Sequence, residues 1–130
     1  MDHRDTEAQR DALSEKVIGC AIEVHRHLGP GLLESAYEMC LCHELEAAGL
    51  TFRRQVPLPV RYKQVSLEMG YRLDVVVEDE LVVELKTVGA IARIHEAQLL
   101  TYLKLSGYPR GLILNFHAPV LKDGIKRMVL

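Results

Sequence analysis

The fold of this chain is decided by the stretch Tyr71-Arg72-Leu73-Asp74-Val75-Val76-Val77-Glu78-Asp79-Glu80-Leu81-Val82-Val83-Glu84-Leu85-Lys86. Two apolar, largely β-branched runs flank the polar segment 78–80, which is the pattern of a β-hairpin. Folding the stretch about Asp79 gives one apolar face, which pairs Leu73 with Leu85, Val75 with Val83, and Val77 with Leu81. A register slipped by one residue would mix apolar and polar side chains, so the hydrophobic pattern itself selects this pairing.

The other face of the predicted hairpin carries charge. It pairs Arg72 with Lys86, Asp74 with Glu84, and Val76 with Val82. Directly opposed side chains lie roughly 5 Å apart at Cβ, where two like charges repel each other. A divalent cation such as Mg²⁺, which takes oxygen ligands, explains why two carboxylates are held together beside a lysine.

A simpler explanation exists for the acidic residues of the hairpin. An acidic residue in a strand is more often on the solvated face of a half-covered sheet. Val76 and Val82 share the charged face, however, and a partly covered carboxylate pair is costly unless it is neutralised.

The segment 78–80 lacks the Gly or Asn of a two-residue turn, so we expect a loop of three or five residues.

Composition and charge limit the class of protein. The 130 residues fit one domain spanning 1–130, in which we expect the polar stretch 1–10 to be frayed. No apolar run is long enough to span a bilayer, and no signal peptide is visible. The odd number of cysteines (Cys20, Cys40 and Cys42) without framework spacing predicts reduced thiols and a cytoplasmic protein. A net charge of −2 gives no overall attraction to nucleic acid, so phosphate binding would need a local patch.

Hydrophobic periodicity, broken by Gly and Pro, predicts the secondary structure. The expected helices cover residues 11–28, 32–48 and 93–106. The expected strands cover residues 55–62, 65–68, 71–77, 81–86, 110–116 and 124–130. Pro57 and Pro59 place the first strand at an edge or a bulge. The order α-α-β-β-β-β-α-β-β predicts an α/β (α+β) fold with a mixed sheet flanked by helices.

Two of the predicted helices carry further candidate residues. Glu34 lies in the first turn of the second helix, where an acid also complements the helix dipole. It is functional only if that helix end points at the hairpin. Gln98 and Tyr102 are four residues apart on the third helix and share a face. They either mark the boundary of an amphipathic helix or orient a phosphate or a water.

Several short motifs, in order along the chain, resemble a known family. Gly31-Leu32-Leu33-Glu34-Ser35-Ala36-Tyr37 matches the G-x-x-E-x-x-Y motif of the GxxExxY family. The match continues from about Val17 to Val129 through Leu73-Asp74, Glu84-Leu85-Lys86 and Gln98-Leu99-Leu100-Thr101-Tyr102. That family resembles a compact member of the PD-(D/E)xK nuclease superfamily. The resemblance implies a restriction-endonuclease-like core, although Leu73 stands where the superfamily has a proline before the acid.

The resemblance also implies a role for each candidate residue. Asp74 corresponds to the metal-binding acid of the superfamily, and Glu84 and Lys86 correspond to its E-x-K pair. Glu34 corresponds to an extra acid from an early helix, so the implied ligands of Mg²⁺ or Mn²⁺ are Glu34, Asp74 and Glu84. The Q-x-x-x-Y helix motif of related nucleases completes the implied catalytic set, which is Asp74, Glu84, Lys86, Gln98 and Tyr102.

Two functions from different classes fit these expectations. The first is a metal-dependent nuclease that acts on DNA, or less favourably on RNA. The second is a nucleic-acid-binding or protein-interaction module that keeps the nuclease fold without turnover. Asp74, Glu84 and Lys86 favour the first, whereas the acidic net charge and the lack of a dense basic stripe favour the second. We expect no membrane partner, and a homodimer is left open.

Overall fold

The structure is a computed structural model that describes the backbone of residues 3–130 and the side chains of residues 12–130. Its central hairpin forms as the hydrophobic pattern predicts. Strands β4 (Arg72–Val77) and β5 (Leu81–Lys86) are antiparallel and pair Val75 with Val83, Val76 with Val82, and Val77 with Leu81. A loop of three residues therefore closes the hairpin, as expected.

The turn residues of the hairpin adopt a backbone that is uncommon outside glycine. Glu78 and Asp79 have φ angles of 52° and 56°. The carboxylate of Glu78 accepts hydrogen bonds from the backbone and the hydroxyl of Thr51. The carboxylate of Asp79 accepts a hydrogen bond from Arg53 at 2.9 Å. These side-chain contacts hold the turn in place of the missing glycine.

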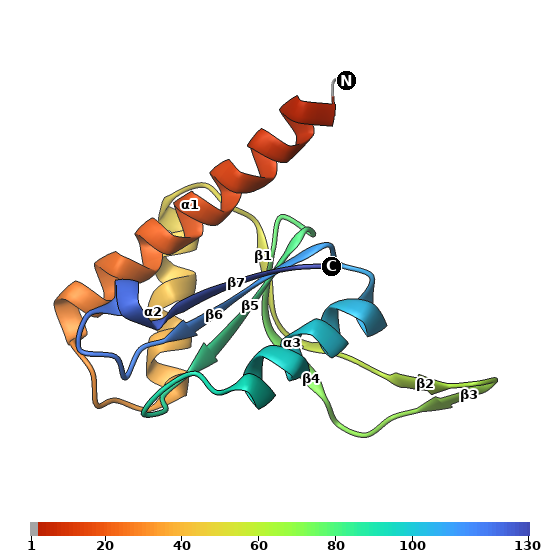
Figure 1. Cartoon of the computed structure of the whole chain (residues 1–130). Coiled ribbons are helices and arrows are strands. Elements are labelled where there is room, and N and C mark those ends of the chain that lie inside the picture. Colours follow the sequence, from red (N-terminus) through yellow and green to blue (C-terminus); the bar gives the residue numbers. More distant parts are fainter. Residues whose placement is uncertain (1–2) are drawn as a thin grey trace.

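The hairpin lies inside a five-stranded mixed sheet (Figure 1). The strand order is β1 (Phe52–Pro57), β4, β5, β6 (Arg110–Asn115) and β7 (Ile125–Val129). β5 and β6 are parallel, whereas the other neighbouring strands are antiparallel. Strands β2 (Val60–Tyr62) and β3 (Val65–Leu67) form a separate two-stranded arm that projects from the body (Figure 1).

Helices cover both faces of the sheet (Figure 1). Helices α1 (His3–Leu28) and α2 (Glu34–Ala47) pack on the face that carries Val75, Val83 and Leu85. Helix α3 (Arg93–Ser106) packs on the other face, over Val76 and Val82. The charged face of the hairpin is therefore covered, as its valines predicted. Among the described residues, none of the helices combines the length and apolar character needed to span a bilayer.

One predicted strand is wrong. The expected strand 55–62 is two strands, because β1 ends at Pro57 on the edge of the main sheet and β2 begins at Val60 in the arm. Pro57 and Pro59 lack the N–H that would continue a ladder, so the chain leaves the sheet between them. The observed order therefore has one more strand than predicted, and a short 3-10 helix (Leu121–Gly124) precedes β7.

The first helix begins earlier than predicted. Its first described residue is His3 rather than residue 11, so most of the stretch that we expected to be frayed continues the helix. Residues 1 and 2 lie outside the described part of the chain. The prediction relied on apolar periodicity, which the stretch 3–10 lacks. Its Glu, Ala and Arg residues nevertheless have good intrinsic helix propensity.

Two glycines give a matched test of how closely the elements pack. A Cβ on Gly124 would lie 2.7 Å from the carbonyl oxygen of Asn115, whereas a Cβ on Gly19 would meet nothing within 4 Å. Gly124→Ala should therefore lower the free energy of unfolding by about 1–3 kcal/mol through overpacking. Gly19→Ala, inside α1, should raise it by roughly 0.5–1 kcal/mol. Urea denaturation measures both, and equal effects would contradict the close contact at Gly124.

Candidate active site

The acidic pair lies where the hairpin opens, at the start of β4 and the end of β5. The backbone ladder between these strands stops at Val75 and Val83. Beyond it, the Asp74 N–H donates to Glu84 Oε2 at 3.0 Å, and the Leu85 N–H donates to Asp74 Oδ2 at 2.9 Å. Each carboxylate thus accepts a hydrogen bond from the backbone of the opposite strand. We call Asp74 and Glu84 the crossed pair.

The opening of the hairpin leaves three predicted pairs outside the backbone ladder: Arg72 with Lys86, Leu73 with Leu85, and Asp74 with Glu84. Leu73 is predicted opposite Leu85 on the face of Val75, but it lies in the other core, with Val76. Gln55, the residue of β1 across from Asp74, has a φ of 50°, and these two residues do not pair. Side chains alternate regularly only along a continuous ladder, and the ladder is interrupted on both sides of Asp74.

Burial sets the electrostatics of the crossed pair. Glu84 is only 7% exposed, and its pKa is raised from 4.5 to about 9, chiefly by desolvation. The charge of Asp74 and a hydrogen bond between the two carboxyl groups contribute to this rise, whereas the charge of Lys86 opposes it. In the absence of a cation, the pair therefore retains a proton at neutral pH.

Lys86 and two residues of α3 complete the predicted catalytic set. Lys86 Nζ lies 3.5 Å from Gln98 Oε1, which joins the end of β5 to α3. Tyr102, one turn further along α3, hydrogen-bonds Gln98. Its pKa is raised by burial and then by the charge of Glu84, with a smaller effect of Asp74. The five residues predicted to be catalytic therefore lie together.

Glu34 approaches the crossed pair from the start of α2. Its Oε2 lies 3.5 Å from the hydroxyl of Thr87, directly after Lys86. Burial raises the pKa of Glu34, and the charge of Asp74 raises it further. Among residues 12–130, however, no group of three or more His, Cys, Asp or Glu side chains is placed to hold a metal ion. The structure thus brings Asp74 and Glu84 together and leaves Glu34 at the edge of the site.

The donor chemistry of the crossed pair fits a divalent cation. Carboxylate oxygens are the ligands that Mg²⁺ and Mn²⁺ prefer. Glu84 is buried beside Asp74, so the pair cannot carry its full negative charge cheaply without a proton or a cation. A divalent ion would supply that neutralisation, with Asp74 and Glu84 as the residues that hold it.

Tyr37 explains the spacing of the G-x-x-E-x-x-Y motif. Its hydroxyl donates to the carbonyl oxygen of Gly29 at 2.5 Å, and its ring stacks on Phe116 with centroids 4.6 Å apart. Gly31, in the same loop, has a φ of 107°, which residues with a side chain rarely adopt. The loop before α2 is therefore fixed, and with it the helix end that carries Glu34.

Two supporting residues were missed by sequence reasoning. Asn115 is buried and hydrogen-bonds both backbone groups of Val88 at 2.8 and 3.1 Å, which closes the loop after Lys86. Glu38 is buried on α2 and accepts hydrogen bonds from Arg54, on β1, at 2.8 and 3.1 Å. Two features of the sequence could have identified them. Asn115 is a polar residue at the end of an apolar strand, and Glu38 is an acid on the buried face of a helix.

The cysteines contribute no metal ligand to the site. Cys20, Cys40 and Cys42 are free thiols. Burial raises the pKa of Cys42 to about 11, which favours the protonated form that does not bind metals.

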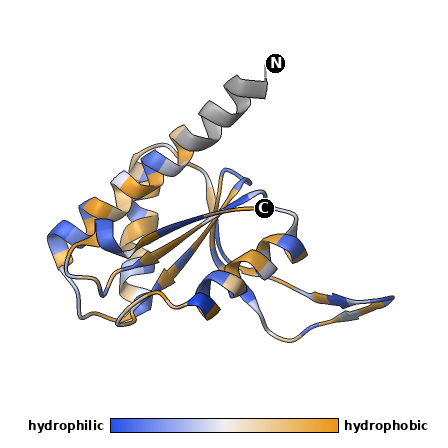
Figure 2. Cartoon of the chain, viewed as in Figure 1, coloured by the Kyte–Doolittle hydropathy of each residue, from blue (hydrophilic) through white to orange (hydrophobic). Residues whose placement is uncertain are grey.

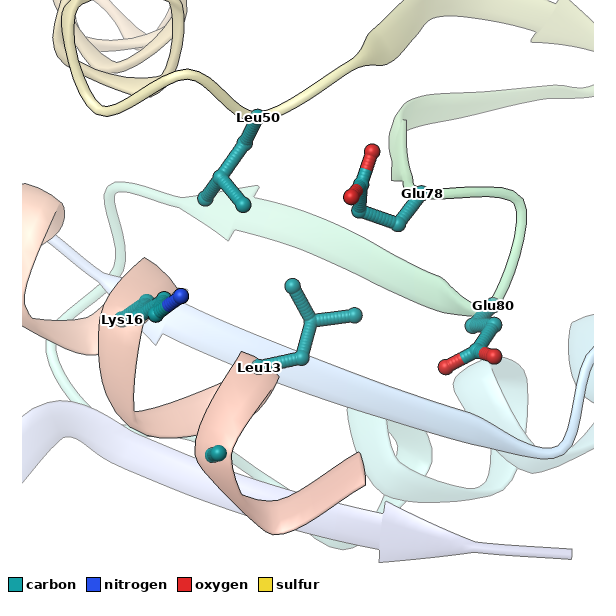
Figure 3. Close-up of a pocket in the computed structure, with 6 residues that line it drawn as sticks. Leu13, Lys16, Leu50, Glu78 and Glu80 are labelled. Carbon is teal, nitrogen blue, oxygen red and sulfur yellow. The ribbon is translucent and has the colours of Figure 1, made fainter. Parts of the chain in front are cut away.

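A hollow lies at the turn end of the hairpin, away from the crossed pair (Figure 3). Leu13 and Lys16 of α1 face Leu50 and the turn residues Glu78 and Glu80 across it (Figure 3). The pKa of Glu78 is lowered by its hydrogen bonds to Thr51, so this acid is an ordinary anion. The hollow is separated from the crossed pair by the length of the hairpin and adds nothing to the candidate site.

Comparison with known proteins agrees with this arrangement. A family model described as the PD-(D/E)XK nuclease superfamily matches residues 11–128, a range that includes every candidate residue above. The mixed sheet flanked by helices is that of a restriction-endonuclease-like fold, as predicted. No curated protein and no solved structure matches the chain significantly. The narrower resemblance to the GxxExxY family stays a prediction.

The raised pKa of Glu84 predicts how stability depends on pH. Between pH 4.5 and about 9 the folded protein binds a proton at Glu84 that the unfolded chain releases. The free energy of unfolding of the metal-free protein should therefore fall as pH rises through this window. Asp74 and Lys86 act on the charge of Glu84 and set the size of the effect, and Tyr102 also lies within range of that charge.

Urea denaturation in EDTA between pH 5 and 9 measures this slope. Glu84→Gln should flatten it, whereas the control Glu80→Gln, at the exposed hairpin turn, should keep it. Parallel slopes for wild type and Glu84→Gln would show that the pH dependence arises elsewhere.

Proposed function

The chain belongs to the PD-(D/E)XK nuclease superfamily, and from this premise we propose that it is a metal-dependent nuclease that hydrolyses phosphodiester bonds in DNA, with RNA as the less favoured substrate. The observation that carries the proposal is the crossed pair of Asp74 and Glu84 with Lys86 beside it. A fold alone does not fix an activity, so these side chains, rather than the fold, support the nuclease function.

The acidic residues would hold the metal. Asp74 and Glu84 would bind Mg²⁺ or Mn²⁺, with Glu34 as a further ligand from α2. Such a cation, when bound, polarises a phosphoryl oxygen and lowers the pKa of a coordinated water. The two backbone hydrogen bonds of the crossed pair fix the carboxylates before any metal arrives.

The remaining residues act on the substrate. Lys86 follows Glu84 by two residues on the same strand, so it projects to the same face and orients the attacking water or neutralises charge that develops on the phosphate. Gln98 contacts the amine of Lys86 and limits where it can lie. Tyr102 hydrogen-bonds Gln98, which fixes the amide in turn.

The second candidate function is a nucleic-acid-binding or protein-interaction module without turnover. Two observations favour it: the net charge of −2, and the lack, within residues 12–130, of three ligating side chains placed to hold a metal. A binding module need not take up a divalent cation, whereas the proposed nuclease must. Titration with Mn²⁺ therefore separates the two functions.

Metal binding should be visible as stabilisation. Mn²⁺ that binds only the folded protein stabilises it by mass action, about 2.7 kcal/mol at 100 times the Kd. Asp74→Asn should abolish this shift in melting temperature. It should also leave the metal-free protein at least as stable as wild type, because the repulsion from Glu84 is removed. Glu80→Gln should respond like wild type, and an unchanged response in Asp74→Asn would place the metal elsewhere.

Catalysis should be separable from binding at Lys86. Because its charge acts mainly on the transition state, Lys86→Ala should lower turnover far more than substrate affinity. Losing one such electrostatic group costs on the order of 100-fold or more in rate. Lys104→Ala removes an exposed lysine of α3 and serves as the control.

The measurement is cleavage and affinity for DNA and RNA with Mg²⁺ and with Mn²⁺, at one salt concentration. Glu84→Gln should weaken metal binding and activity together. The nuclease mechanism fails if wild type cleaves no nucleic acid with any divalent cation, or if Lys86→Ala cleaves as fast as wild type. The module without turnover then becomes the better description.

A further inference from the structure

A mainly apolar groove opens directly beside the candidate active site. It has a volume of about 320 Å³ and lies between the arm and α3, with Val60, Tyr71, Ile94, Gln98 and Tyr102 among its walls. Gln98 and Tyr102 also belong to the proposed catalytic set. Whatever is held at the crossed pair is therefore next to this groove. We call it the tyrosine groove.

Two tyrosine rings form a corner of the tyrosine groove. Tyr71 and Tyr102 have ring centroids 6.2 Å apart and planes inclined by 55°. Tyr71 stands immediately before β4 and is 46% exposed, so it is open to a ligand. Aromatic side chains with open faces are the platforms on which proteins stack nucleobases.

The arm extends the apolar wall away from the body of the protein. Its register pairs Val60 with Leu67 and Tyr62 with Val65, so these four side chains share one face. Val60 lines the tyrosine groove, so this face is the one turned toward it. Tyr62 is 62% exposed and Val65 52%, although both are apolar in body. Figure 2 accordingly shows hydrophobic stretches along the projecting arm.

The arm and the segment that leads from it into β4 carry a net positive charge, which suits a polyanion, whereas the chain as a whole is slightly acidic. Residues 60–72 contain Arg61, Lys63 and Arg72 but only one acid, Glu68, whereas the whole chain has a net charge of −2. Arg61 and Lys63 are exposed, and the amine of Lys63 lies 5.4 Å from the ring centre of Tyr62. Basic groups interleaved with aromatic rings are typical of surfaces that bind single-stranded nucleic acid.

We propose that the tyrosine groove receives an unpaired nucleobase, stacked against Tyr71 and Tyr102, and that the protein acts on single-stranded or locally unpaired nucleic acid. This inference rests on the proposed function and names its class of substrate. Lys63, whose amine lies beside the ring of Tyr62, then contacts a phosphate of the same strand as it runs along the arm. Arg61 alternates with Val60 and Tyr62, so it lies on the opposite face of the arm and contributes positive charge only.

A continuous duplex fits the surface less well. Its bases are stacked on one another and present only their edges, so they cannot lie on Tyr71 or Tyr102. Duplex affinity comes largely from many phosphate contacts, and outside the arm the basic residues are scattered and partly paired. Arg53, Arg54 and Arg127, for example, form ion pairs with Asp79, Glu38 and Glu15.

Binding without cleavage tests the proposal directly. The full chain, in EDTA, is titrated against a short fluorescein-labelled oligodeoxynucleotide, either single-stranded or annealed to its complement, and anisotropy is recorded. Wild type should bind the single strand more tightly. Tyr71→Leu should weaken single-strand binding roughly 5- to 100-fold, the usual range for the loss of one stacked base, and leave duplex binding unchanged.

Two further variants separate stacking from damage to the fold. Tyr71→Phe keeps the ring and should retain the single-strand affinity. Tyr108→Leu makes the same change at a tyrosine that contacts Asp79 and Arg53 at the turn end of the sheet, and it should also bind like wild type. The chain has five tyrosines and no tryptophan, so quenching of intrinsic fluorescence by the single strand gives a second readout.

Several results would overturn the proposal. These are tighter binding of duplex than of single strand, equal losses on both in Tyr71→Leu, or full single-strand affinity in Tyr71→Leu. A dimer seen by sedimentation that Tyr71→Leu dissolves and the oligonucleotide does not would assign the tyrosine groove to a second copy of the chain.

Failure of the groove proposal and failure of the nuclease proposal give different results. Selective, Tyr71-dependent binding of the single strand without cleavage by any divalent metal would support the groove and end the nuclease mechanism. Metal-dependent cleavage of duplex that Tyr71→Leu leaves unchanged would support the nuclease and end the proposal for the groove.

Discussion

The open end of the hairpin depends on the two hydrogen bonds that Asp74 and Glu84 accept across it. In a regular antiparallel ladder the N–H groups of Asp74 and Leu85 would be satisfied by backbone carbonyls. Here carboxylates take that place, so the backbone pairing ends at Val75 and Val83 and the two strands remain connected through side chains. The carboxylates are consequently held at fixed positions, which is what a metal or a reacting phosphate requires of its ligands.

The surrounding elements turn this local exchange into a constrained site. Helices cover both faces of the sheet and shield Glu84 from water. This desolvation raises the pKa of Glu84. Tyr37 and Asn115 then fix the two loops beside the pair, one before α2 and one after β5. Phe116, against which Tyr37 stacks, follows Asn115 directly, so both loops are anchored at the same end of β6.

The sequence predicted those features that depend on local periodicity. Alternation fixed the register of Val75 with Val83, and apolar spacing with a closing glycine gave α3 at its observed bounds. Leu73 was misplaced because alternation assumes an unbroken ladder, and the ladder ends where the carboxylates of Asp74 and Glu84 accept hydrogen bonds from the opposite strand. Tyr37 and Asn115 have partners on segments distant in sequence, and no local pattern reports such contacts.

The position of α3 would connect the proposed chemistry with the proposed choice of substrate. Helix α3 covers Val76 and Val82 with one face and presents Gln98 toward Lys86, while Ile94 faces the tyrosine groove. These side chains belong to one rigid helix, so their relative positions cannot change independently. A strand seated in the groove would therefore be placed at a set distance from Lys86. Positional control of this kind would let a small chain align a phosphate without a large basic surface, because binding energy would come from stacking as well as from charge.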